Sequence, residues 1–208
     1  MILFSILTGC SPLPLGSLPP TPTPLIERDI SPTIVWPSTV PELIPLLRGG
    51  ELERFGAARE LGEFGADAAP AVPALVANLY YDGVYDVRQA AAWALGEIGP
   101  GSNKAIPALA AVVLTDFVHV RRAAAIALGK IGDKTAIYSL VKALDDEDDG
   151  VSGEAARSIG ILAGQSFPDM NTDGFQMNEN GVLVIVEAAK DWWENGGQYI
   201  DWTNYSSK

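Results

Sequence analysis

The sequence predicts an all-α protein, a right-handed α-solenoid of about four helical hairpins with a C-terminal capping helix. Three observations carry this prediction. A similar pattern occurs four times, and its central glycine recurs every 31 to 34 residues, at Gly62, Gly96, Gly129 and Gly160. Each copy holds two segments with apolar residues at helical spacing. The only period-two run that competes is residues 182–186. Because one hairpin cannot bury its apolar stripe alone, the copies are expected to stack.

Residues 1–9 are predicted to be a signal peptide. An apolar run ends in the letters LTGC, whose cysteine is Cys10, and this resembles a bacterial lipobox. In that family the chain is cut before the cysteine, whose thiol receives a diacylglycerol. The resemblance implies a membrane-anchored lipoprotein of the cell envelope, facing the periplasm or the exterior. No Lys or Arg precedes the run, a departure that a start upstream of Met1 would explain. The alternative is a buried N-terminal strand with a free thiol.

Residues 10–39 are expected to form a lipidated, proline-rich tether. Nine of the fifteen prolines lie in residues 12–41. Proline fixes φ and removes a hydrogen-bond donor, which favours an extended polyproline II chain. Such a spacer would hold a folded domain off a membrane surface; the alternative is an N-terminus without a role. Its last part, with Trp36 and residues 34–35, is expected to dock onto the first repeat.

The repeat domain is predicted to span residues 40–165, in units of about 40–70, 71–105, 106–136 and 137–167. Helix ends are visible in the pattern. Prolines fall in the first helical turn, where a missing N–H costs nothing, at Pro41, Pro73 and Pro107. Glycines that suit a left-handed cap follow the last apolar residue, at Gly65, Gly99 and Gly132. Asp86 is expected to cap the second helix of its unit.

The shared pattern is Pro-x-Leu followed by Val-Arg-x-x-Ala-Ala-x-Ala-Leu-Gly-x-Ile-Gly. It resembles short HEAT-like repeats, a type also found in phycobilin lyases, over roughly residues 40–165. The resemblance implies an ARM-type α-solenoid that binds other macromolecules.

The arginine of the Val-Arg step recurs at Arg54, Arg88 and Arg121, and the fourth unit has Ser152 there. One interpretation is an anion-binding row on the concave side. The other is that each arginine pairs with a neighbouring acid or loop carbonyl and sets the stack. The second is favoured, because periodic residues in a solenoid are usually structural.

Aromatic residues cluster in equivalent loops of two units. Tyr80, Tyr81 and Tyr85 belong to the second unit, and Phe117 and His119 to the third. Loops on one edge of a solenoid line up, so these side chains are candidates for a partner-binding patch. Alternatively, they cover the ends of their own helices.

Two acidic segments are candidate calcium sites. Asp169, Asn171 and Asp173, with the carbonyl of Phe175, match the front of a calcium loop, but position 12 is Asn180 rather than a carboxylate. We expect at most weak calcium binding there, and otherwise a polar connection. The acidic run 145–149 would attract Ca²⁺ or a basic partner; the favoured alternative is a solvated turn, in which Asp148→Ala changes stability by no more than about 0.5 kcal/mol.

Residues 166–208 are predicted to be a polar loop followed by the capping helix, at 181–195. Ile185, Ala188, Ala189, Trp192 and Trp193 give that helix an apolar face. One of the paired tryptophans would cover the last hydrophobic layer and the other would lie near the surface. Trp202 is expected to fold back onto the helix.

Composition excludes several function classes. The 208 residues carry a net charge of −12, which argues against a nucleic-acid partner. One Cys and one His exclude a disulfide framework and a multi-histidine metal site, and argue against a His-based triad. No stretch approaches the roughly 18 apolar residues of a spanning helix.

The sequence thus predicts a non-enzymatic protein-binding scaffold, tethered at the cell envelope by an N-terminal lipid and lacking a cofactor. Two alternatives stay open, a phycobilin lyase-like enzyme or chaperone, and a calcium-dependent envelope adhesion module.

Overall fold

The computed structural model describes residues 35–168, 176–178 and 183–202. The chain divides into two units, Met1–Val35 and Trp36–Lys208, and the fold belongs to the second. The predictions for Cys10, for residues 10–34 of the proline-rich tether and for the calcium-loop residues 169–175 and Asn180 fall outside the described residues.

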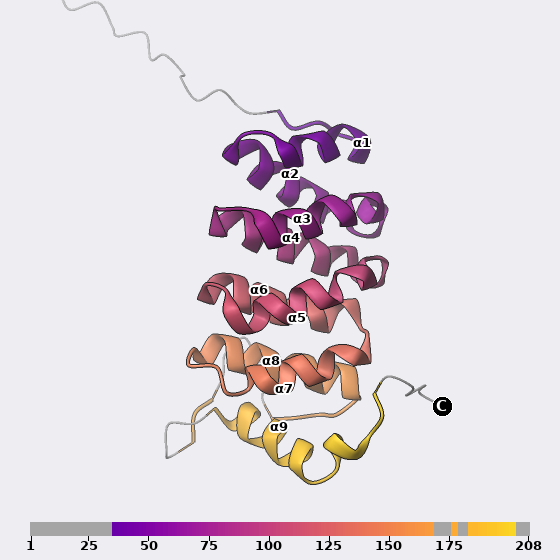
Figure 1. Ribbon diagram of the computed structural model, residues 1–208. Helices are drawn as coiled ribbons and strands as arrows, with labels where there is room; N and C mark the ends of the chain where they lie inside the picture. The colour runs from indigo at the N-terminus through magenta and orange to yellow at the C-terminus, as the bar shows by residue number, and fades with distance from the viewer. Residues whose placement is uncertain (1–34, 169–175, 179–182, 203–208) are drawn as a thin grey trace, which may run out of the picture. The chain divides into compact units, whose positions relative to one another are not determined.

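Helices in the described part of the chain follow one another as stacked pairs (Figure 1). The first unit holds α1 (Val40–Leu43), a 3₁₀ helix (Ile44–Arg48) and α2 (Glu51–Glu63). The next pairs are α3 (Val72–Tyr81) with α4 (Tyr85–Ile98), α5 (Ile106–Thr115) with α6 (Val118–Ile131), and α7 (Ile137–Ala143) with α8 (Asp149–Ala163). Short 3₁₀ helices connect the pairs, at Gly65–Ala71, Gly99–Ala105 and Lys134–Ala136.

Neighbouring pairs contact each other through equivalent helices. The second helices form one row, α2 to α4 to α6 to α8, and the first helices form another, α3 to α5 to α7. The described residues contain no β-strand, only an isolated bridge between Met177 and Leu183. The predicted all-α solenoid is therefore confirmed.

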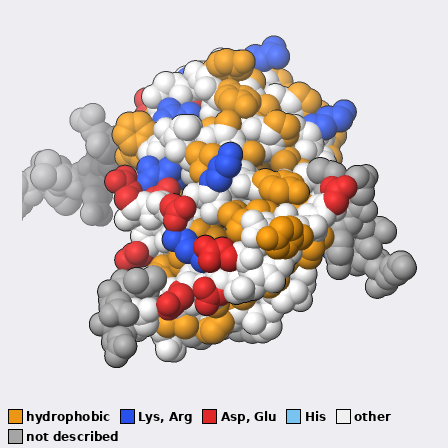
Figure 2. Space-filling model, turned by 60° about the horizontal axis from the view of Figure 1, so that its bottom comes forward, with side chains coloured by type: hydrophobic (Ala, Val, Ile, Leu, Met, Phe, Trp, Pro, Cys, Tyr) orange, Lys and Arg blue, Asp and Glu red, His pale blue; other side chains and the backbone are white. Residues whose placement is uncertain are grey.

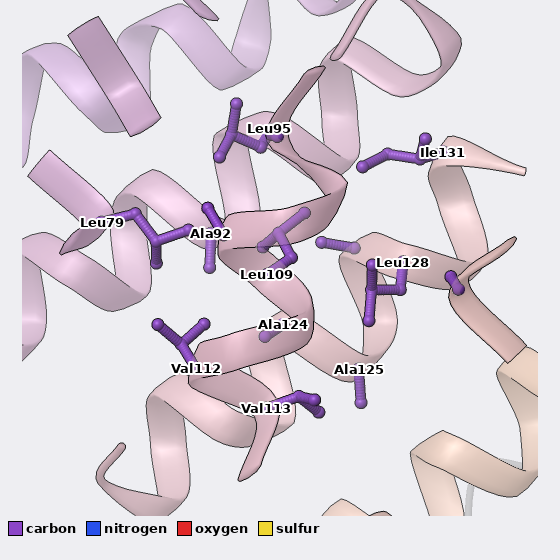
Figure 3. Close-up of a cluster of buried hydrophobic side chains, with 14 of the residues drawn as sticks. Leu79, Ala92, Leu95, Leu109, Val112, Val113, Ala124, Ala125, Leu128 and Ile131 are labelled. Atoms are coloured by element: carbon purple, nitrogen blue, oxygen red, sulfur yellow. The ribbon is translucent and has the colours of Figure 1, made fainter. Parts of the chain in front are cut away.

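The core lies between the two rows of helices (Figure 3). Leucines from both helices of a pair, such as Leu79, Leu95, Leu109 and Leu128, are fully buried. Each contributes about 1.5–3 kcal/mol relative to an exposed side chain. Small residues such as Ala92 are fully buried between them, which lets the helices approach closely.

The recurring glycine of the repeat marks where consecutive second helices touch. A Cβ added to Gly62 would lie 2.2 Å from the ring of Trp93, and one added to Gly96 would lie 2.9 Å from the Cα of Ala127. At Gly129 it would lie 2.4 Å from the Ser158 hydroxyl. A side chain at any of these positions would push the next repeat away.

The expected helix ends are largely confirmed. Each predicted proline lies in a first helical turn. The three predicted cap glycines have φ of 54°, 67° and 83°. The Asp86 prediction is wrong, because α4 begins at Tyr85 and its N-cap is Val84. The preceding turn is instead closed by Asp82, whose carboxylate accepts a hydrogen bond from the Val84 N–H at 3.0 Å.

The first helix of the first unit does not continue as an α-helix. It changes to 3₁₀ geometry at Ile44, next to Pro45. Proline inside a helix lacks the N–H for an i→i−4 bond, and its ring clashes with the carbonyl of residue i−4. Pro45 instead lies in the first turn of the 3₁₀ helix, where an N–H has no acceptor within the helix, so the missing donor costs nothing.

Trp36 covers the outer side of the first repeat. Its ring occupies the place where Gly56 would carry a Cβ, because such an atom would lie 1.9 Å from the ring. Docking onto the first repeat is therefore confirmed for Trp36, whereas Val35 is 85% exposed.

The array is followed by α9 (Val184–Glu194), which contacts α8. The expected division between the paired tryptophans is wrong, because both are half-buried. Trp192 contacts Phe167 and Trp202, and Trp193 meets Tyr138 edge-on, with centroids 5.9 Å apart.

Trp202 folds back as predicted. It is 3% exposed and donates its indole N–H to the Gly197 carbonyl at 3.0 Å. Figure 2, in which the α9 end comes forward, shows hydrophobic side chains exposed between acidic and basic ones. Tyr138 and Tyr199 are among the exposed hydrophobic residues of this part of the chain.

Candidate functional site

The three repeated arginines each join two consecutive repeats. Arg54 donates to both carboxylate oxygens of Asp82, at 2.5 and 3.0 Å, and to the Gly49 carbonyl at 2.9 Å. Arg88 does the same with both oxygens of Asp116, at 2.8 and 2.6 Å, and with the Asp82 carbonyl at 2.8 Å. Each guanidinium thus joins a loop of its own repeat to the loop of the next.

Arg121 does the same with Asp146, at 2.8 and 2.7 Å, and with the Asp116 carbonyl at 3.0 Å. The three arginines and their aspartates, Asp82, Asp116 and Asp146, are here called the arginine ladder. The fourth repeat ends the ladder, because the buried Ser152 has its hydroxyl near the carbonyls of its own helix start. The geometry is the one that the structural interpretation of these arginines requires. Their forks face protein carboxylates rather than an anion from solution.

These hydrogen bonds also change the pKa of the aspartates that the arginines contact. Burial alone would raise the pKa of the Asp82 carboxyl, but hydrogen bonds from Arg54 and from the Val84 N–H hold this pKa below its ordinary value. The pKa of Asp116 is lowered in the same way by Arg88 and the Phe117 N–H. The side chains of Arg88 and Asp116 are only 12% and 11% exposed. Such shielded bidentate pairs are stronger than surface ion pairs.

The acidic run is more than a solvated turn. Asp145 pairs with Lys190 of α9 at 2.6 Å, and Asp146 completes the ladder. The Asp148 carboxylate accepts the Val151 N–H at 3.0 Å and caps α8. The sequence interpretation is therefore wrong for Asp146 and Asp148. Within the described ranges, no three acidic, histidine or cysteine side chains are grouped closely enough to hold a metal ion.

The aromatic loop residues do not form one patch with His119. Tyr81 and Phe117 are 86% and 63% exposed, and Tyr80 and Tyr85 are about half as accessible as Tyr81. Tyr85 contacts Phe117 of the next repeat at a centroid distance of 5.5 Å. Tyr80 and Phe117 border the ladder, whereas His119 lines a different hollow on α6.

That hollow is a groove of about 800 Å³ along the exposed faces of α2, α4 and α6, here called the inner groove. Leu52 and Phe55 of α2 line it and are 59% and 36% exposed. The half-buried Trp93 of α4 and Ile126 of α6 complete an apolar strip.

Charged side chains flank this strip. Arg59 lies over the ring of Trp93, with its guanidinium carbon 4.9 Å from the centroid. Arg122 of α6 is 52% exposed and reaches Glu154 only at 3.5 Å. Lys130 is held by Glu97 at 2.5 Å.

Of the residues that line the inner groove, only His119 was predicted from the sequence as a binding residue. The pattern did contain a signal for the others. Arg59, Trp93 and Ile126 each lie three residues before the recurring glycine, and all three line the groove. Large side chains there face solvent along the array, and two of the three are apolar.

A family model for HEAT repeats matches residues 40–123 and 116–169. The chain belongs to the HEAT repeat family. A comparison with curated proteins gave no match. None of the helices that the structure describes is long and apolar enough to cross a membrane.

Solved structures that are similar to this chain include one of a protein complex and two of engineered proteins. This HEAT repeat protein is similar to the complex of CpcE and CpcF of phycocyanin lyase from Nostoc sp. PCC7120, with 26% identity and a TM-score of 0.54, over 82% of this chain and 70% of that one. The two engineered proteins are 28% identical to it, with TM-scores of 0.47 and 0.48, over 60% and 61% of this chain. The chain spans 62% and 64% of their lengths.

Proposed function

We propose that this HEAT repeat protein is a non-enzymatic scaffold that binds another protein in its inner groove. The observation that carries the proposal is the exposure of Leu52 and Phe55 beside Trp93, in a concave site. Apolar and aromatic side chains gathered in a hollow are typical of protein contacts. The similar phycocyanin lyase structure is itself a complex of two proteins, which supports a protein partner. The net charge of −12 favours a protein over a nucleic acid.

Site-specific photocross-linking in the producing cell tests this proposal. Benzoylphenylalanine replaces Leu52 in the inner groove or, as a matched control, the exposed Ala77 of α3 on the other row of helices. We expect a cross-linked protein of defined size from the Leu52 position and none from the Ala77 position. Equal cross-linking from both positions would show that the groove is not the binding face.

The proposal includes a tether at the cell envelope, through a lipid on Cys10. It is supported by the LTGC motif and by the proline-rich stretch that follows it. A diacylglycerol with a further acyl chain anchors a protein stably, because each buried CH₂ contributes about 0.8 kcal/mol. Cys10→Ser should therefore move the protein from the membrane fraction to the soluble one. If the variant still pellets with membranes as the wild type does, the anchor is not at Cys10.

A phycobilin lyase-like role is the second candidate, favoured by the similarity to the phycocyanin lyase complex. The inner groove, at about 800 Å³, is within the usual volume of small-molecule sites. Titration with a free bilin separates the two roles. A shifted bilin absorption band that Trp93→Phe weakens would favour the lyase-like role, and an unchanged spectrum would favour the scaffold.

A further inference from the structure

We propose that the occupant of the inner groove is a partner segment whose apolar side chains lie beside acidic ones. This inference rests on the proposed function and adds the chemistry of the partner. It is carried by the uneven distribution of charge around the apolar strip.

The basic side of the groove is helix α6. Over Val118–Ile131 this helix contains Arg121, Arg122 and Lys130 and no acidic residue, although acids outnumber bases 26 to 14 in the whole chain. Of these cations, Arg122 and Lys130 line the groove, so an approaching carboxylate meets basic and no acidic side chains on this helix.

Two of these cations already have close partners. Arg121 is held in the arginine ladder by Asp146, and Lys130 is held by Glu97. Arg122 is different, because the ion pair that it makes among the described residues is long, at 3.5 Å, and Glu154 is shared with Arg157 at 3.4 Å. A guanidinium has five N–H donors, so Arg122 has capacity left for a bidentate carboxylate.

Arg59 supplies a second cation beside the apolar strip. It is exposed and stacks on Trp93, and it makes no ion pair within the part of the chain that the structure describes. A carboxylate bound there would keep the cation–π contact, since the donors lie at the edge of the guanidinium.

The acidic residues of the groove set the orientation of the segment. Glu51 and Asp86 lie where α2 and α4 begin, and both line the groove; Glu97, the third acid of the lining, is already paired with Lys130. Glu51 and Asp86 repel carboxylates from that part and favour binding of the partner's acids at Arg59 and Arg122. The apolar side chains of the segment would then contact Leu52 and Phe55.

Fluorescence anisotropy with the full chain tests this inference. The probes are three labelled helical peptides of about 16 residues, long enough to follow the groove. All three share the same sequence apart from the positions that are changed. The first peptide has Leu and Phe on one helix face and Glu beside that face. The second has Lys in place of Glu, and the third keeps Glu but has Ala in place of Leu and Phe. We expect the first peptide to bind at least about tenfold more tightly than the other two, because it alone matches both parts of the groove.

Variants locate the effect. Arg122→Gln should weaken the first peptide about tenfold and leave the second unchanged. Arg48→Gln, at an exposed position outside the groove, is the matched control and should change neither. Leu52→Ser should weaken the first peptide without a large loss of stability, because this side chain is already exposed.

The outcomes distinguish this inference from the proposed function. Preference for the Lys peptide, or binding of the Glu peptide that Arg122→Gln does not weaken, would overturn the acidic partner. Cross-linking from position 52 would still support a groove that binds protein. Failure of all three peptides to bind would also overturn the inference, and the cross-linking experiment would then decide the function separately.

Discussion

Removing the central rung of the arginine ladder should destabilise the array far more than a surface ion pair would. Arg88→Met deletes three charge-assisted hydrogen bonds, two to Asp116 and one to the Asp82 carbonyl. Among the described residues, it leaves the shielded carboxylate of Asp116 one hydrogen-bond donor, the Phe117 N–H at 2.7 Å. Breaking one partner of a buried ion pair costs about 3–5 kcal/mol. Because both side chains are about one-tenth exposed, we expect about 2–4 kcal/mol in the free energy of unfolding.

Urea unfolding followed by far-UV circular dichroism measures this loss, and thermal unfolding should show a midpoint about 5–15 °C lower. The control is Arg48→Met, which removes an exposed cation of the first repeat. A double variant, Arg88→Met with Asp116→Asn, should lose less stability than the two single variants together, because the charge left unpaired by each is absent. If Arg88→Met unfolds within about 0.5 kcal/mol of the control, the ladder is only a set of surface pairs and the reasoning is refuted.

Four further predictions test the ladder acid Asp82, the core, the acidic run and the calcium loop. The free energy of unfolding should fall below about pH 4, because the pKa of Asp82 is lower in the folded protein and the unfolded chain therefore binds a proton at higher pH. In urea unfolding at a series of pH values, Asp82→Asn should lose stability less steeply than the wild type. Equal slopes of stability against pH for the two proteins would contradict this prediction. Leu128→Ala should cost about 2–5 kcal/mol. Asp148→Ala should cost about 0.5–2 kcal/mol, because it removes a helix cap. Glu147→Ala should change stability by no more than about 0.5 kcal/mol, because its side chain is 90% exposed. Equal urea midpoints for Leu128→Ala, Asp148→Ala and Glu147→Ala would refute the assigned packing. Calorimetric titration with Ca²⁺ should give a Kd no tighter than about 10⁻⁴ M, and a single site below about 10⁻⁵ M that Asp169→Ala abolishes would instead support the calcium-dependent adhesion module.

The solenoid was predictable because each repeat states its register several times over. Proline at the helix start, alanines on the buried side and glycine at the helix end all give the same helix boundaries in successive units. Such agreement between levels specifies a fold strongly. Pro45 is visible in the sequence, but the sequence does not show whether the helix kinks there, ends there or tightens into 3₁₀ geometry.

The partners of the arginines were harder to predict, because an ion pair between repeats depends on how the loops line up. A regular signal did exist, since Asp82 follows Arg54 by 28 residues and Asp116 follows Arg88 by the same interval. The last pair breaks the interval, with Asp146 only 25 residues after Arg121. Length differences of this kind are absorbed by loops, so the sequence indicated that the arginines pair without showing where.

The inner groove was missed for a different physical reason. Periodicity identifies residues that are buried between helices, whereas the groove is defined by large side chains that remain outside the core. Leu52 and Phe55 are not part of the repeat pattern, and Trp93 finds its place in the groove because Gly62 of the preceding second helix leaves room for its ring. Such a site becomes visible only when successive helices are placed side by side.

The end of the arginine ladder at Ser152 sets where this protein can grow by duplication of a unit. A copied hairpin inserted between the second and third repeats would receive Arg88 from the unit before it and could offer its own arginine to Asp116. A copy added after the fourth repeat would face Ser152, which carries no charge to hold it, and would have to displace α9 from α8. Repeats are therefore expected to be gained by insertion within the array, in evolution or by design. The number of repeats can then change while both ends of the array stay the same.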